Sequence, residues 1–283
     1  MLSFKKQTRK ELVKTKMDEL NYEVCDAHAH IFPEKIAEKA VNSIGDFYSL
    51  DMFYSSGSPS ALLEGGEKIN TTHYLVCSVA TVPHQVQSIN KFILSECEKH
   101  PEFVGFGTLH PDSPDTAQEV EGLIASGIKG IKLHPDFQRF NIDSKKAMKI
   151  YEMIEGRLPV LIHMGDPRYD YSRPHRLENV IKAFPKLKVI AAHLGGYERW
   201  EEAITCLYSE NVYFDTSSSL AFMSPEFAKE LILTYGEDRI FFGTDFPMWD
   251  HVSELKRFLN LRLDENTNRK ILCGNFKRFF GIN

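Results

Sequence analysis

Short apolar runs alternate with longer amphipathic stretches along most of the chain. The runs are rich in Val, Ile, Leu and Phe, which is typical of parallel strands that helices cover on the outside. We predict strands at residues 24–30, 73–80, 103–110, 128–134, 159–164, 188–193, 212–216 and 240–245. After the first run they recur about every 25–30 residues, the length of one strand, one helix and two loops.

Apolar residues at helical spacing follow most of these runs. They predict helices at residues 34–47, 85–100, 144–155, 176–183, 197–208, 225–235, 252–259 and 265–280. At 85–100, Val86, Ile89 and Ile93 share one face, and Pro101 ends the helix. Regular alternation of strands and helices indicates a parallel sheet, and eight units indicate closure into a single (β/α)8 barrel, or TIM barrel.

Two segments do not fit the repeat. Residues 1–22 are basic and predict an N-terminal helical extension, either a solvated helix or an anchoring one, before a barrel at 23–283. Residues 31–72 are much longer than a usual connection and include a stretch at 55–66 that is rich in Gly and Ser. Because they follow the end of the first strand, we expect them to form a lid or substrate wall over the barrel.

Composition narrows the class of protein. A length of 283 residues suits one barrel, and a net charge of -5 makes nucleic acid an unexpected partner. No apolar run approaches the ~20 residues needed to span a bilayer, and the start of the chain lacks the apolar region of a secretory signal. Five scattered cysteines favour a reducing, cytoplasmic location. A homo-oligomer is left open.

Polar residues collect where the predicted strands end, which is where TIM barrels carry their active sites. His28 and His30 are two positions apart, so they point to the same face of the first strand. His163, His193 and Asp245 end the fifth, sixth and eighth strands. Imidazole and carboxylate are good ligands for zinc and other divalent metals, and such a metal lowers the pKa of bound water to about 7.

The alternative is that each histidine is only a hydrogen-bonded structural residue, as a lone histidine at a strand end usually is. Four strand ends that carry such residues together favour a metal site instead. We therefore predict a divalent metal ion, with zinc as the first choice and manganese as the second, and a small-molecule substrate.

Several motifs give the chain a resemblance to a known family. They are Asp26-Ala-His28-Ala-His30-Ile-Phe-Pro33, Gly130-Ile-Lys-Leu-His-Pro135, Ile162-His163, His193-Leu-Gly-Gly196 and Gly243-Thr-Asp245-Phe-Pro247. In this order they resemble the amidohydrolase superfamily, in particular the amidohydrolase 2 branch of metal-dependent hydrolases and non-oxidative decarboxylases. The motifs are specific for the family but not for its reaction.

The resemblance implies roles for individual residues. It makes His28, His30, His163 and Asp245 the metal ligands, and Asp245 also the group that moves protons. His193 is then a catalytic residue that activates water or polarises the substrate, or alternatively a hydrogen-bonding neighbour of the ligands. On the fourth strand and just beyond it, the sequence offers Lys132, His134 and Arg139 as substrate-binding residues. The alternatives are a structural Lys132, a carboxylated Lys132 that bridges two metal ions as in two-metal members of the family, and a solvated Arg139.

We expect hydrolysis of a small amide, lactone or ester through water that the metal activates. The alternative is a metal-dependent decarboxylase (carboxy-lyase) or hydratase of the same family. A third reading, a barrel that only binds metal or a partner, is disfavoured because every ligand position is filled. We expect one metal per chain, because two residues of a strand span ~6.6 Å and Lys132 precedes the inward-facing His134, so Lys132 lies deeper than the ligands.

Overall fold

The computed structural model describes residues 22–283, so the predicted N-terminal extension lies almost wholly outside the described residues. One parallel sheet has eight strands in the order in which they follow along the chain. They are β1 (Val24–His30), β2 (Thr71–Cys77), β3 (Phe103–Thr108), β4 (Gly130–Leu133), β5 (Val160–Ile162), β6 (Val189–Ala191), β7 (Val212–Asp215) and β8 (Ile240–Phe241). The predicted TIM barrel is confirmed.

The barrel closes where β8 and the loop after it meet β1. Ala29 forms a parallel bridge with Phe246. Backbone hydrogen bonds on either side of the bridge run from Asp245 N to His28 O at 2.9 Å and from His30 N to Phe246 O at 2.8 Å. The residues of two predicted metal positions, His28 and Asp245, therefore lie at the seam of the barrel.

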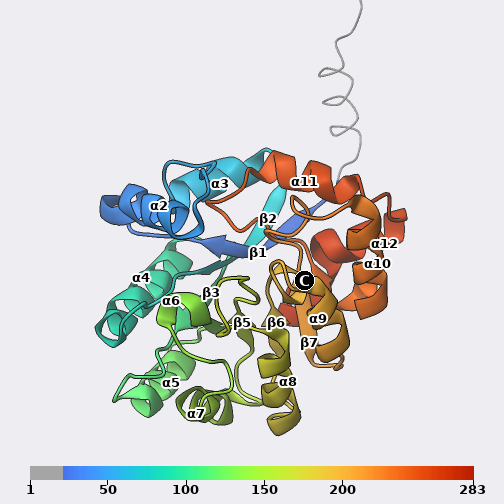
Figure 1. The fold of residues 1–283 in the computed structure, drawn as a ribbon. Coiled ribbons are helices and arrows are strands. Elements are labelled where there is room, and N and C mark those ends of the chain that lie inside the picture. The colour runs from blue at the N-terminus through green and yellow to red at the C-terminus, as the bar shows by residue number, and fades with distance from the viewer. Residues whose placement is uncertain (1–21) are drawn as a thin grey trace, which may run out of the picture.

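Helices surround the strands, as Figure 1 shows. They are α2 (Glu34–Tyr48), α3 (Pro59–Glu67), α4 (Val86–Lys99), α5 (Thr116–Ala125), α6 (Pro135–Gln138), α7 (Lys145–Ile154), α8 (Pro174–Ala183), α9 (Trp200–Cys206), α10 (Pro225–Tyr235), α11 (His251–Leu259), α12 (Glu265–Arg269) and α13 (Asn275–Phe280). α12 and α13 are joined by a π-helical turn, Lys270–Gly274, and match the predicted helix at 265–280. α5 was not predicted.

The stretch at 55–66, expected as loop, contains α3. The side chain of Ser58 accepts a hydrogen bond from Ala61 N at 3.3 Å, and Pro59 occupies the first turn. Both are helix-start signals. Gly66 brings α3 close to the sheet, because a Cβ there would lie 2.0 Å from the hydroxyl of Tyr74. Here glycine serves packing between a helix and a strand rather than loop flexibility.

The last strands are shorter than predicted, because their final residues leave the sheet. β6 ends at Ala191 and β8 at Phe241. His193 and Asp245 follow in turns with positive φ of 60° and 57°. Non-glycine residues adopt this conformation rarely, and often at functional sites.

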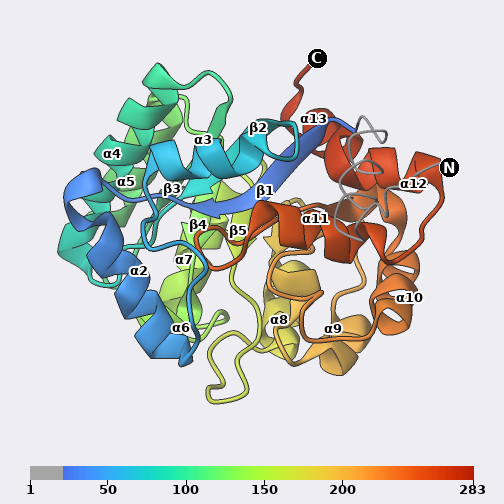
Figure 2. The same cartoon turned by 90° about the horizontal axis from the view of Figure 1, so that it is seen from above.

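Two apolar clusters build the core. The larger lies between the strands and the surrounding helices and includes Val76, Ile131, Ile150 and Leu231. The smaller joins Leu161 and Ile190 of the strands with Cys273 and Phe276 near the C-terminus. Within residues 22–283, no helix has the length and apolar character that crossing a membrane requires. Figure 2 shows α3 and α11 beside β1, where the early and late parts of the chain meet.

Candidate metal centre

Three side chains from the seam of the barrel converge. His28 Nε2 lies 3.2 Å from His30 Nε2, and Asp245 Oδ1 lies 3.6 Å and 3.4 Å from these two nitrogens. The ligand atoms of this group lie close enough together to hold one metal ion. Three of the four predicted ligands are thus adjacent.

A bulge in β1 directs these histidines. Cys25 and His30 are five positions apart, whereas their partners on β2, His73 and Cys77, are four apart. The extra residue lies between Asp26 and Ala29. A bulge changes the face to which later side chains point, and bulges occur often beside active sites.

The fourth predicted ligand, His163, contacts His193 next to this group. His163 Nδ1 lies 2.9 Å from His193 Nε2. The ring of His193 stacks on that of His28, with centroids 5.2 Å apart. All five predicted metal and catalytic side chains therefore form one continuous cluster at the barrel mouth, in which His30 is partly exposed and the other four are buried.

Hydrogen bonds determine which nitrogen of each ring carries the proton. His193 Nδ1 lies 3.0 Å from Ser217 O, and His163 Nε2 lies 3.0 Å from Gly165 O. A carbonyl oxygen only accepts, so each of these nitrogens donates. The opposite nitrogens, His193 Nε2 and His163 Nδ1, are left with lone pairs that face each other.

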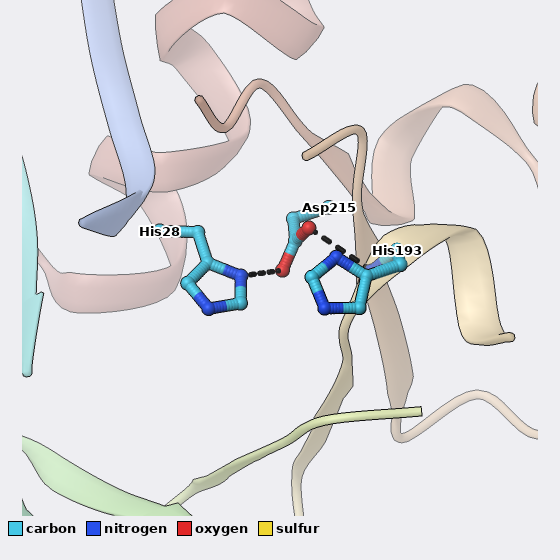
Figure 3. A group of neighbouring side chains, drawn as sticks. All are labelled: His28, His193 and Asp215. Carbon is cyan, nitrogen blue, oxygen red and sulfur yellow. Dashed lines mark hydrogen bonds and ion pairs between the residues drawn. The ribbon is translucent and has the colours of Figure 1, made fainter. Parts of the chain in front are cut away.

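Asp215 orients two of the histidines, as Figure 3 shows. Its Oδ2 lies 3.1 Å from His28 Nδ1, and its Oδ1 accepts from the backbone N–H of His193 at 3.1 Å. His28 Nε2 is then free to face the centre. This arrangement of carboxylate and histidine is the one that orients metal ligands in proteins. The sequence indicated the level of Asp215 in the barrel but not this contact.

The electrostatics of the cluster suit a cation. Burial lowers the pKa of His28 to about 4 and holds that of His163 well below its usual value, so both rings are neutral. Burial would raise the pKa of Asp245, but the nearby histidines hold it well below its ordinary range. Two facing lone pairs at 2.9 Å beside an ionised carboxylate repel each other unless positive charge lies among them. The residues present therefore fit a divalent ion.

Lys132 reaches the same cluster. Its Nζ lies 2.9 Å from His28 Nε2, and the side chain is fully buried. The expected difference in depth is bridged by the long side chain. Burial lowers the pKa of this amine.

Hydrogen bonds with Asp26 and Ser218 hold the seam residues in place. Asp26 Oδ1 accepts from the backbone N–H of His28 at 3.1 Å and of Thr244 at 3.0 Å. Ser218 Oγ donates to Asp245 Oδ2 at 2.6 Å and accepts from Trp249 Nε1 at 2.8 Å. The carboxylate of Asp245 is thereby fixed from the side opposite the histidines.

His134 belongs to a neighbouring group with Asp136 and His163. The rings of His134 and His163 stack at 3.9 Å between centroids. Tyr48, the last residue of α2, places its hydroxyl 3.0 Å from His134 Nε2 and 3.5 Å from His163 Nε2. The segment at 31–72, which the sequence predicts to be a lid or substrate wall, thus reaches the cluster through Tyr48, although the sequence does not predict the contact with His134.

Arg139 lies farther out than the other predicted residues. It is exposed, follows α6, and lines a cavity of about 730 Å³ whose wall also includes His30 and Asp136. Arg139 is therefore at a distance from the histidine cluster but on a cavity that is continuous with it.

The fold and this cluster together define a TIM-barrel protein whose His and Asp side chains could hold a metal ion. A family model described as amidohydrolase matches residues 25–282, and the chain belongs to this family. The resemblance inferred from the motifs is confirmed.

Solved structures are similar over nearly the whole chain. One is a dihydroxybenzoic acid decarboxylase from Polaromonas with bound manganese and 2-nitroresorcinol, 17% identical, with a TM-score of 0.70 over 92% of this chain and 97% of that one. Another is a putative 2-pyrone-4,6-dicarboxylic acid hydrolase from Pseudomonas putida, 18% identical, with a TM-score of 0.64 over 91% and 97%. An uncharacterised TIM-barrel protein from Bordetella bronchiseptica has 16% identity and a TM-score of 0.74 over 92% and 98%. At these identities the likeness establishes the fold.

Proposed function

We propose that this chain is a metal-dependent hydrolase of a small amide, lactone or ester. One divalent ion, zinc first and manganese second, would be held by His28, His30, His163 and Asp245. The observation that carries the proposal is the pair of facing lone pairs on His163 and His193, next to the group that His28, His30 and Asp245 form. When bound, the ion supplies a Lewis acid that polarises a carbonyl oxygen and lowers the pKa of a coordinated water.

The protein's own side chains would then transfer protons and bind the substrate. Asp245, held by Ser218 through Oδ2, accepts a proton from the attacking water and returns it to the leaving group. His193 donates from Nδ1 to Ser217 O, so its Nε2 is free to accept a proton or to orient the substrate. Lys132, His134 and Arg139 would bind a carboxylate of the substrate.

The test begins with protein that has been stripped of metal and then reloaded with zinc or manganese. We expect no turnover of small esters, lactones and amides without metal and recovery with about one equivalent per chain. Hydrolysis in oxygen-18 water should place the label in the product acid. Full activity in verified metal-free protein, or product without the label, would contradict the proposal.

Decarboxylation is the second candidate. Its support is the similarity to decarboxylases of dihydroxybenzoate, one of them solved with manganese and an aromatic inhibitor. In this reaction Asp245 would deliver a proton to the carbon that loses the carboxyl group. Release of carbon dioxide from hydroxybenzoates, without incorporation of water oxygen, would favour this candidate and exclude hydrolysis as the activity on those compounds.

A further inference from the structure

The cavity that begins at His30 is mostly apolar. Its volume is about 730 Å³, within the range of small-molecule sites. One wall is a face of α2 with Ile36, Ala40 and Ile44, which recur every four residues. α2 and α4 follow β1 and β2 and lie on the same side of the barrel in Figures 1 and 2.

The opposite wall comes from α4, with Ile89 and Phe92. Both are partly buried rather than covered, and Ile36 across from them is 50% exposed. Large apolar side chains exposed to water along one hollow are costly, and in soluble proteins they commonly mark a binding surface.

Few charged side chains line the cavity, which limits the polar groups that a bound molecule could pair with. Besides His30, the ionisable lining residues are Asp136 and Arg139. Among residues 22–283, the Arg139 side chain forms no ion pair. The cavity therefore offers a long apolar surface that starts at a metal-ligand residue, together with one exposed guanidinium.

We propose that this cavity binds the apolar arm of the substrate, an alkyl chain or aryl ring attached to the group that reacts at the metal centre. The proposal rests on the proposed function, because His30 joins the reacting end to the cavity. It assigns substrate choice to Ile36, Ala40, Ile89 and Phe92 rather than to the histidine cluster. A substrate that lacks the arm would react at the same centre but bind weakly.

The first test measures binding and does not require turnover. Calorimetry of metal-loaded protein with acetate, butyrate, hexanoate and octanoate should show affinity rising with chain length. Complete burial of a methylene group corresponds to up to about fourfold per added carbon. A parallel series of p-nitrophenyl esters should show the same trend in kcat/KM.

Variants locate the effect. Ala40→Phe from α2 and Ile89→Trp from α4 each fill the cavity, so each should flatten the chain-length trend while metal content and thermal unfolding stay near wild type. Glu38→Phe adds the same ring as Ala40→Phe on the exposed face of α2, outside the cavity, and should keep the trend.

The outcomes separate the two proposals. Turnover of the acetate ester with no dependence on chain length overturns the cavity assignment and leaves the hydrolase standing. A chain-length trend in carboxylate binding with no ester turnover supports the cavity and counts against the hydrolase. If affinity still rises with chain length in both Ala40→Phe and Ile89→Trp, the cavity does not bind the apolar arm. The same conclusion follows if Glu38→Phe abolishes the rise as fully as the two cavity-filling variants do.

Discussion

Asp215 shows how much a single buried residue can determine by holding a proposed metal ligand in place. Its carboxylate remains ionised because, although burial raises its pKa, His28 and the other partners lower it further, below the ordinary value. It holds the proton of His28 on Nδ1 and so presents Nε2 to the centre. The residues around Asp215 in the sequence do not predict that it orients His28, because the contact joins β7 to β1 across 187 positions.

We predict that Asp215→Asn weakens metal binding about 10- to 100-fold, the usual effect of losing such a partner. The amide has no charge to stabilise the Nδ1 proton of His28, so the ring loses its fixed orientation. Competition against a chelator of known affinity measures the change without any activity assay. Asp112→Asn, which alters an exposed ion pair with Lys146, is the control. Equal affinity in wild type and Asp215→Asn would contradict the role.

Lys132 bears on the number of metal ions. Its amine contacts His28 within the cluster, so it is close enough to take part in a second site. We still predict one equivalent of metal in wild type, and also in Lys132→Ala, because the proposed ligands His28, His30, His163 and Asp245 do not include the amine. Metal analysis of protein grown with zinc and bicarbonate decides this. Two equivalents that are lost together in Lys132→Ala would show a lysine-bridged pair instead.

The residues that the sequence identified share one property: they stand at the ends of apolar runs. His28, His30, His163, His193 and Asp245 could be found because a barrel brings all strand ends to one face. Tyr48 and Asp136 could not be found in this way. Tyr48 ends a helix, and its contact with His134 depends on where α2 packs rather than on any period in the sequence.

At the level of elements, the loop after β5 positions His163 through its backbone. Gly165 has a φ of 77°, and a Cβ there would lie 2.5 Å from the backbone N and O of Tyr197. Its carbonyl oxygen accepts a hydrogen bond from Nε2 of His163. Gly156 has a similar φ of 71° but open space around it. A side chain at Gly156 would therefore meet only the cost of the left-handed backbone conformation. A side chain at Gly165 would also meet the cost of close contact with the backbone of Tyr197.

We predict that Gly156→Ala lowers the free energy of unfolding by about 1–2 kcal/mol, the cost of a left-handed residue. Gly165→Ala should cost about 1–3 kcal/mol more, because the methyl group meets backbone that has to shift. It should also weaken metal binding, since Gly165 O moves away from His163. Urea unfolding and metal content measure both effects. Matching losses in the two variants would show that the contact with Tyr197 is easily relieved.

Helices and strands were predicted well where apolar periodicity is long and less well where local chemistry decides. α4 and α10 have clear periods and fall within a residue or so of their expected bounds. α3 is not predicted because its two glycines indicate a loop, whereas in the structure Gly66 allows the helix to approach β2 and Gly65 faces Tyr54 and His251. The bulge in β1 is invisible in the sequence, because it depends on pairing with another strand.

Across the whole molecule, stability should depend on pH through Glu254 on α11. The side chain is almost completely buried, which raises its pKa from 4.5 to about 7 despite its ion pair with Arg257. The folded state therefore binds this proton more tightly than the unfolded state does. The stability that it contributes is fully present below pH 4.5 and is lost as the pH rises through about 7.

We predict that Glu254→Gln removes this loss and raises the free energy of unfolding at pH 8, relative to wild type, by on the order of 3 kcal/mol. At pH 4.5 the two proteins should differ little. Urea unfolding across this range makes the comparison. Glu265→Gln, which changes an exposed ion pair with Arg269, should follow wild type at every pH. A constant difference between Glu254→Gln and wild type would mean that folding does not shift the pKa of Glu254.

The seam of the barrel has a consequence for the order in which the protein matures. The hydrogen bond from Thr244 to Asp26 joins residues 218 positions apart, and Asp245 completes the donor group that His28 and His30 begin. During synthesis His28 and His30 therefore leave the ribosome early, but Asp245 emerges only when most of the chain has been made. A chain that ends before Asp245 lacks one of the four proposed ligands, and such long-range closure forms late in folding. Acquisition of metal would thus follow completion of the polypeptide, which protects unfinished chains from trapping an ion in the wrong geometry.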